Sequence, residues 1–283
     1  MTCLIGTVAG VFDLTGRPLL EGRAISHLAR RREEWWGVGD DGLWRDGELV
    51  AVPAPGVTLN CVQPSPETVW MGADSARLYR LEGDRLVEDP GFAATPGREE
   101  WHTPWGGPPD VRSMSLDADG VLYVNVHVGG IVRYGPDGPS PTLDIHADVH
   151  QVVAHPERSG VVVAACASGL AESVDGVEFT FRTEGLDHRY SRAVALDDDT
   201  VLVSSSRGPR GGDARLHRGR LGEGALTPVP GLPAFPGNLD THCLLAGPEG
   251  YFLGHESSVW ASPDGGDTWS VSVDDLPKVT CLT

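Results

Sequence analysis

Histidine is the residue of this 283-residue chain with the clearest capacity for chemistry. Three of the ten histidines, His27, His150 and His242, each stand second in a short apolar segment of similar pattern. A neutral imidazole is a good ligand for zinc, iron or copper, and it also exchanges protons near neutral pH. If the fold brings these segments together, the three side chains predict a site for a divalent transition metal.

The three histidine segments belong to a repeat that runs through the whole chain. Similar segments place Asn60, Arg112, Ser191 and Thr280 at the histidine position, and the successive spacings are 33, 52, 38, 41, 51 and 38 residues. A further 30 residues lead from Thr280 round to His27, so seven units account for the sequence. Each unit contains about four short strands separated by Gly, Pro, Asp and Asn turns.

A period of about 40 residues with four strands is typical of β-propeller blades. The sequence therefore predicts an all-β fold: a single seven-bladed β-propeller with four-stranded antiparallel blades, which occupies residues 1–283. The chain starts on a second strand, residues 3–8, and ends on an inner strand, residues 279–282. The closing blade is thus formed by both termini, which removes an exposed sheet edge.

Residues 262–269 read Ser-Pro-Asp-Gly-Gly-Asp-Thr-Trp, which fits the pattern S-x-D-x-G-x-T-W, and residues 173–179 look like a shortened copy. This motif resembles the Asp box of BNR-type propellers, which are sialidase-like and related (WD40/YVTN-type) repeat proteins. The resemblance implies a propeller and a motif that lies away from the catalytic face. Sialidases also have an arginine triad that starts in an F/Y-R-I-P segment. No such segment occurs near this N-terminus, so a sialidase-like glycoside hydrolase is the least favoured function.

Further candidate residues lie at or near the start of inner strands, or in the connections on that side. Arg112 and Arg192 are suited to a carboxylate or phosphate, because the guanidinium group binds such anions through two parallel hydrogen bonds. The long connection over residues 98–110 carries aromatic side chains that could cover a ligand. The predicted ligand-binding residues are Asn60, Arg112, Arg192, His127, His255, Trp101, His102 and Trp105.

Each of these assignments has a purely structural alternative. The histidines could bond to neighbouring blades, the arginines could pair with acidic residues, and the tryptophans could fasten a long loop. Two functions therefore remain open. One is an enzyme, metal-dependent and of hydrolase or lyase type, that acts on a small polar or anionic ligand in an axial pocket. The other is a non-catalytic propeller that binds a protein or peptide on the same face. No GxSxG, P-loop or HExxH motif identifies catalytic residues.

Charge and cysteine content bear on the partners and the compartment. The net charge of −18 opposes binding to nucleic acid or to an anionic membrane. No apolar run reaches the roughly 18 to 20 residues of a membrane span, and the N-terminus lacks the basic region of a signal peptide. The five cysteines are an odd number, and each lies in an apolar strand. We therefore expect reduced cysteines and a cytoplasmic protein.

Overall fold

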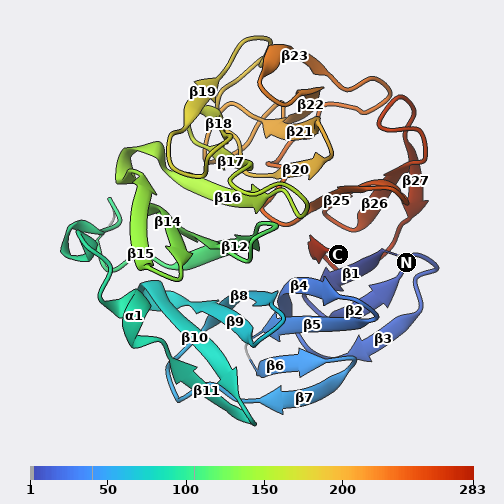
Figure 1. Ribbon diagram of the computed structural model, residues 1–283. Coiled ribbons are helices and arrows are strands. Elements are labelled where there is room, and N and C mark those ends of the chain that lie inside the picture. Colours follow the sequence, from blue (N-terminus) through green and yellow to red (C-terminus); the bar gives the residue numbers. More distant parts are fainter. Residues whose placement is uncertain (1–2, 40, 105) are drawn as a thin grey trace.

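The computed structural model describes residues 3–39, 41–104 and 106–283. Its described strands form seven four-stranded antiparallel sheets arranged as a ring around a central axis (Figure 1). The chain is therefore an all-β seven-bladed propeller, and the fold predicted from the repeat is confirmed. We number the blades from the N-terminus and give the strands of each blade from the axis outward.

Blade 1 contains β28 (Val279–Leu282), β1 (Leu4–Thr7), β2 (Gly10–Asp13) and β3 (Pro18–Glu21). Blade 2 contains β4 (Ile25–Arg31), β5 (Glu34–Gly39), β6 (Gly42–Arg45) and β7 (Glu48–Ala51). Blade 3 contains β8 (Leu59–Pro64), β9 (Val69–Ala73), β10 (Arg77–Glu82) and β11 (Arg85–Glu88). Blade 4 contains β12 (Val111–Leu116), β13 (Leu122–Val126), β14 (Gly130–Gly135) and β15 (Gly138–Leu143).

Blade 5 contains β16 (Val149–Ala154), β17 (Val162–Cys166), β18 (Gly169–Ser173) and β19 (Thr180–Arg182). Blade 6 contains β20 (Val194–Asp197), β21 (Thr200–Ser205), β22 (Arg215–Arg220) and β23 (Glu223–Pro228). Blade 7 contains β24 (Leu244–Gly247), β25 (Gly250–His255), β26 (Ser258–Ser262) and β27 (Ser270–Val273). Short helices interrupt some connections: η1 (Asp74–Ala76), α1 (Pro90–Ala93), η2 (Arg98–Glu100) and η3 (Ile145–Ala147).

Blade 1 closes the ring with strands from both ends of the chain. Strand β28 pairs with β1, and the backbone N–H of Leu4 donates to the carbonyl of Thr283 at 2.7 Å. The N- and C-terminal strands accordingly lie side by side in Figure 1. This is the closure that the order of strands in the sequence predicts, and it leaves no inner strand of the ring unpaired.

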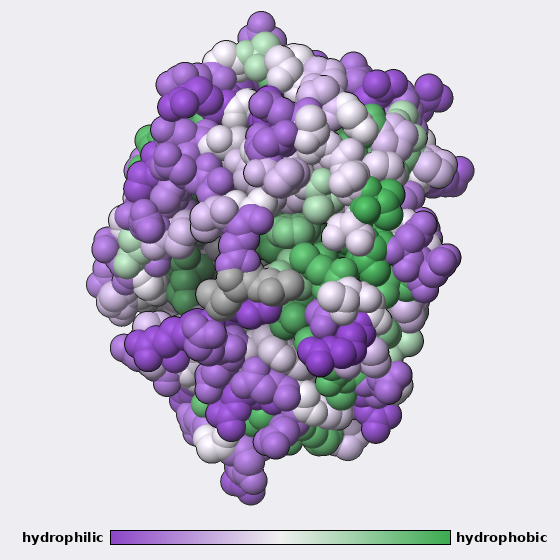
Figure 2. Space-filling model, turned by 90° about the vertical axis from the view of Figure 1, so that its right-hand side faces the viewer, coloured by the Kyte–Doolittle hydropathy of each residue, from purple (hydrophilic) through white to green (hydrophobic). Residues whose placement is uncertain are grey.

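The hydrophobic core lies between the blades rather than in one centre. Each sheet packs against a neighbour on both faces, so its middle strands carry continuous apolar runs; every residue of β13 and β17 is buried. The five cysteines are unpaired and buried in these layers, as expected for small apolar side chains. The flank of the molecule in Figure 2 is mostly hydrophilic, with one band of hydrophobic residues. Among the described residues no helix is long and apolar enough to span a membrane.

The Asp-box segment forms a tight turn between β26 and β27. The carboxylate of Asp264 accepts hydrogen bonds from the backbone N–H and hydroxyl of Thr268 and from the hydroxyl of Ser262. The indole N–H of Trp269 donates to the carbonyl of Gly266 at 3.2 Å, so the ring packs under the hairpin. All these groups satisfy one another locally, which is the structural role expected from the sequence.

Candidate functional site

The inner strands of several blades begin with a β-bulge, and this bulge directs polar side chains to one end of the central channel. In blades 3, 4 and 5 the residues left out of the strand pairing are Asn60, Arg112 and His150. In blade 2, however, the unpaired residue is Ser26, because Ile25 and His27 are the paired positions on either side of it. The alignment of His27 with Asn60, Arg112 and His150 is therefore wrong by one residue. The pattern of apolar residues does not show which residue of the segment is the extra residue of the bulge.

A cavity of about 380 Å³ opens at this end of the channel, and we call it the entrance cavity. Most of its lining comes from the first residues of the inner strands. Five of the residues singled out in the sequence meet there, together with four that were not. The lining consists of Asn60, Arg112, His127, Arg192 and His242, with Ser26, Asp110, Asp240 and Thr241.

The two arginines of the entrance cavity differ in their partners. Arg192 pairs with Asp240 at 2.7 Å and also donates to the carbonyl of Pro209. Arg112 forms no ion pair with any described carboxylate, and Asp240 and Asp148 act on its charge only at longer range. Burial, followed by the positive charge of Arg192, lowers the pKa of Arg112. The guanidinium of Arg112 is thus a positive charge without a direct carboxylate partner in the part of the chain that the structure describes.

The side-chain amide of Asn60 points to the same conclusion. Its Nδ2 atom is shielded from solvent and has no hydrogen-bond partner among the described residues. A buried donor without a partner costs about 1–3 kcal/mol, so such groups usually await a ligand or ordered water. Arg112 and Asn60 therefore offer two kinds of hydrogen-bond donor to one cavity.

His27 and His242 form a stacked pair at the channel, with ring centroids 3.9 Å apart. Nδ1 of His27 accepts a hydrogen bond from the backbone N–H of Val62, and Nε2 of His242 lies 3.1 Å from the carbonyl of Arg112. Burial, then the neighbouring His242, holds the pKa of His27 well below its usual range, and burial lowers that of His242 to about 4. Both rings are neutral, and each has a backbone partner in another blade: His27 bonds to the neighbouring blade 3, whereas His242 reaches across the channel to blade 4.

His242 also separates two spaces along the axis. Besides the entrance cavity, it lines a second cavity of about 250 Å³ that follows the inner strands further into the ring. Its backbone adopts a φ of +66°, an uncommon conformation for a residue other than glycine. The backbone N–H is held by Oε1 of Gln151 at 3.1 Å, which fixes this conformation.

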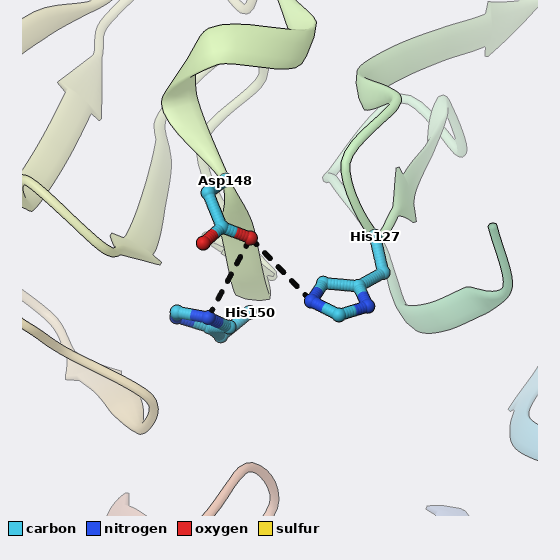
Figure 3. A group of neighbouring side chains, drawn as sticks. All are labelled: His127, Asp148 and His150. Atoms are coloured by element: carbon cyan, nitrogen blue, oxygen red, sulfur yellow. Dashed lines mark ion pairs between the residues drawn. The ribbon is translucent and has the colours of Figure 1, made fainter. Parts of the chain in front are cut away.

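His150 belongs to another group, which contains His127 and Asp148 (Figure 3). His127 follows β13 directly, whereas Asp148 and His150 lie at the start of β16 in the next blade. Oδ1 of Asp148 is 3.4 Å from Nε2 of His127 and 3.7 Å from Nε2 of His150. The three predicted metal ligands His27, His150 and His242 are therefore not brought into one ligand set; within the described residues, only His127, Asp148 and His150 form such a group.

The surroundings of this group set its protonation. Burial lowers the pKa of His150 to about 4, so its ring is neutral. The nearby His127 lowers the pKa of Asp148, which is therefore an anion. Nδ1 of His150 donates to the carbonyl of Ser191 at 2.6 Å, and its Nε2 lies 3.1 Å from the hydroxyl of Tyr190.

Three further predicted ligand-binding residues, Trp101, His102 and His255, do not line the entrance cavity. Trp101 is buried against Phe92, and the guanidinium of Arg98 lies 5.2 Å from its ring. The indole therefore packs beneath the long loop and stabilises it. His102 is exposed, with Nδ1 2.7 Å from the carbonyl of Glu100. His255 stacks on Phe235 at 4.6 Å. Trp105 lies outside the described residues.

Sequence reasoning missed the acidic and aromatic members of the site. Asp148 precedes His150 by two residues with a φ of +46°, and only an aspartate in a turn at the start of a repeat could have drawn attention to it. Tyr190 and Asp240 contribute through contacts with neighbouring blades, which no pattern within one repeat records.

No protein-family model and no curated protein sequence matches the chain. Solved structures do match it. A putative 6-phosphogluconolactonase from Bacteroides uniformis has a TM-score of 0.65 at 14% identity and is aligned over 100% of this chain and 98% of its own. An ancestral GH74 enzyme has a TM-score of 0.64 at 11% identity, over 95% of this chain and 40% of its own.

A third match is a catalytically inactive virginiamycin B lyase from Staphylococcus aureus with quinupristin, with a TM-score of 0.56 at 12% identity. This alignment covers 90% of the present chain and 82% of the lyase. At such low identity the three structures show a shared propeller fold and nothing finer. The names of these neighbours span a lactonase, a GH74 enzyme and a lyase, so the fold alone does not select a function.

Proposed function

We propose that the entrance cavity binds a small organic anion, a carboxylate or a phosphate ester, and that the protein acts on it as a hydrolase or lyase. The observation that carries this proposal is Arg112, a largely buried guanidinium without an ion-pair partner among the described residues. In a chain of net charge −18, carboxylates that could neutralise it are abundant. Leaving Arg112 without one is costly unless a ligand supplies the negative charge.

The rest of the lining suits an oxyanion. The free Nδ2 donor of Asn60 and the hydroxyl group of Ser26 add hydrogen-bonding groups to the two guanidinium groups. The volume of about 380 Å³ is at the lower end of the range for small-molecule sites. It accommodates a metabolite-sized molecule, whereas a folded protein partner would contact mainly the outer rim.

His127 is the residue best placed to act on a bound anion. It lines the entrance cavity and contacts the carboxylate of Asp148, and an imidazole oriented by a carboxylate is a common general base. Proton abstraction from water leads to hydrolysis, and abstraction from carbon leads to elimination.

Isothermal titration calorimetry with citrate, inorganic phosphate and sugar phosphates tests the proposal. We expect at least one of these anions to bind the parent chain, and Arg112→Gln to weaken that binding by about 10- to 100-fold. Arg207→Gln is the matched control, because Arg207 is an exposed arginine outside the cavity lining and its loss changes the net charge equally. Equal binding by the parent and by Arg112→Gln would refute the proposal, and binding of none of these anions would favour a protein- or peptide-binding propeller.

A further inference from the structure

The group of His127, Asp148 and His150 carries an inference that goes beyond anion binding and depends on other residues. The three side chains come from two neighbouring blades and point toward one another (Figure 3). All three potential donor atoms lie within 4.8 Å of one another. We propose that they form a binding site for a divalent transition-metal ion such as Zn²⁺, Co²⁺ or Fe²⁺.

The spacing of the donor atoms fits one shared ion. Around a tetrahedral zinc ion with ligand distances of about 2.1 Å, neighbouring donor atoms are about 3.4 Å apart. The two measured separations from Oδ1 of Asp148 are 3.4 Å and 3.7 Å. Direct hydrogen bonds between these atoms would be shorter, near 2.8 Å. The observed arrangement is thus too open for a tight ion pair and has the width that a metal ion fills.

One carboxylate oxygen of the group, Oδ1 of Asp148, lacks a hydrogen bond among the described residues. This atom is also shielded from solvent. A buried carboxylate oxygen in this state requires a cation or a proton donor. Asp148 also holds a left-handed backbone conformation, with a φ of +46°, and its carbonyl accepts from the N–H of Ala167. Such strain is found mainly where function requires a side chain in one position.

His150 is oriented as metal-binding histidines usually are. Its Nδ1 donates to the carbonyl of Ser191, so the lone pair of the ring lies on Nε2, the atom that faces Asp148. A ligating imidazole almost always donates its second nitrogen to a carbonyl or carboxylate in this way. The hydroxyl of Tyr190, 3.1 Å from the same Nε2, is placed to bond a water on the ion.

The donor set also selects the metal. Two imidazoles and one carboxylate favour zinc, iron, cobalt or copper over magnesium and calcium, which prefer oxygen ligands. Three protein ligands leave a fourth position free, which is the arrangement of catalytic rather than structural zinc sites. Because His127 lines the entrance cavity, a ligand there can reach that position.

One neighbouring charge opposes metal binding. Arg112 contributes to lowering the pKa of both Asp148 and His150, so its positive charge also repels a cation in this group. An anion that contacts both Arg112 and the metal would relieve this repulsion. Removal of the arginine should therefore strengthen the binding of a metal ion alone while it weakens the binding of anions. Because the expected changes in metal affinity and in anion affinity have opposite signs, removal of Arg112 tests the two proposals separately.

Cobalt titration of the full chain, stripped of metal by a chelator, tests the site. The visible absorption of bound Co²⁺ reports its ligands and geometry. We expect one equivalent to bind the parent chain and Arg112→Gln, and His127→Ala and Asp148→Asn to weaken binding by about 100-fold or more. Asp148→Asn keeps the shape of the side chain, so it remains informative if replacement of the buried His150 prevents folding. His102→Ala, which removes an exposed histidine from another part of the chain, should bind Co²⁺ as the parent does.

Two results would overturn the proposal. The first is a folded parent chain, verified by circular dichroism, that binds neither Co²⁺ nor Zn²⁺. The second is equal Co²⁺ affinity in the parent, His127→Ala and Asp148→Asn, because the ion would then be bound elsewhere. In either case the group is a contact between His127, Asp148 and His150 that binds no metal, and anion binding through Arg112 is unaffected.

Discussion

Two pairs of histidines lie near the same end of the channel, and they differ in how their polar atoms are satisfied. His27 and His242 lie against each other with their rings tilted by 39°, and each ring has a backbone partner in another blade. His127 and His150 instead face the carboxylate of Asp148, whose Oδ1 atom lacks a hydrogen bond. Residue type and location are nearly the same in the two pairs. What distinguishes the second pair is the carboxylate that its rings face, because one oxygen of this carboxylate has no hydrogen-bond partner among the described residues.

The arginines repeat this contrast on the walls of the entrance cavity. Arg192 is neutralised by Asp240, whereas Arg112 is not paired with any described carboxylate. Three groups at this end of the channel without such a partner, Arg112, Asn60 and Asp148, belong to the first residues of β8 and β12 or to the turn before β16. The stacked pair thus stabilises the ring, and the unsatisfied groups form the part that awaits a ligand.

The largest expected effect concerns the buried neutral histidines. The pKa values of His150 and His242 are about 4 in the folded chain, against an ordinary value of 6.5. Between pH 6.5 and pH 4 the unfolded chain binds more protons, so the free energy of unfolding falls as the pH falls through this range. The loss amounts to about 3 kcal/mol for each histidine. Urea unfolding at pH 7 and pH 4.5 measures it, and equal values at the two pH values would contradict the assigned neutrality.

The next-largest expected effect is a difference in stability between variants of the two histidine pairs. His27→Ala leaves the N–H of Val62 without its acceptor and removes the ring stacked on His242, which should cost about 3 kcal/mol of stability. His127→Ala removes a long contact with Asp148 and a ring contact with His150, and it should cost less than about 1 kcal/mol. Thermal unfolding of both variants measures the difference. A larger loss for His127→Ala than for His27→Ala would reverse the assignment of the two pairs.

A smaller effect is expected at Trp101, which packs beneath its loop and does not cover the cavity. Trp101→Phe should lower stability by about 1–2 kcal/mol and leave anion affinity within about twofold of the parent. Chemical unfolding and calorimetry on the same preparation measure both quantities. A loss of anion affinity at unchanged stability would restore the role of a lid that the sequence suggested for this residue.

The smallest expected effect is a gain in stability rather than a loss. Arg112→Gln removes a guanidinium without a direct partner that lies near Arg192, so the ligand-free chain should gain about 0.5–1 kcal/mol of stability. The stabilisation that a bound anion confers on the parent should disappear in this variant. Thermal unfolding with and without phosphate or citrate measures both changes. Destabilisation of the ligand-free variant would show that Arg112 is a structural residue.

The repeat, the strand order and the closure by both termini follow from the sequence because apolar strands and turn residues recur in every blade. Asn60 and Arg112 were also placed at the channel from the repeat alone. His27 was aligned one residue out of register. The same bulge occurs in blades 2 to 5, and the pattern of apolar residues does not reveal that its extra residue in blade 2 is Ser26. The sequence did not predict roles for Asp148 and Tyr190, because these roles arise from contacts between blades. Such contacts depend on three-dimensional packing.

An anomalous-difference map of crystals grown with Zn²⁺ tests most directly the claim that the unsatisfied group, not the stacked pair, is functional. The account predicts the strongest peak between Nε2 of His127, Oδ1 of Asp148 and Nε2 of His150. A peak beside His27 and His242, or no peak at the three predicted ligands, would contradict it.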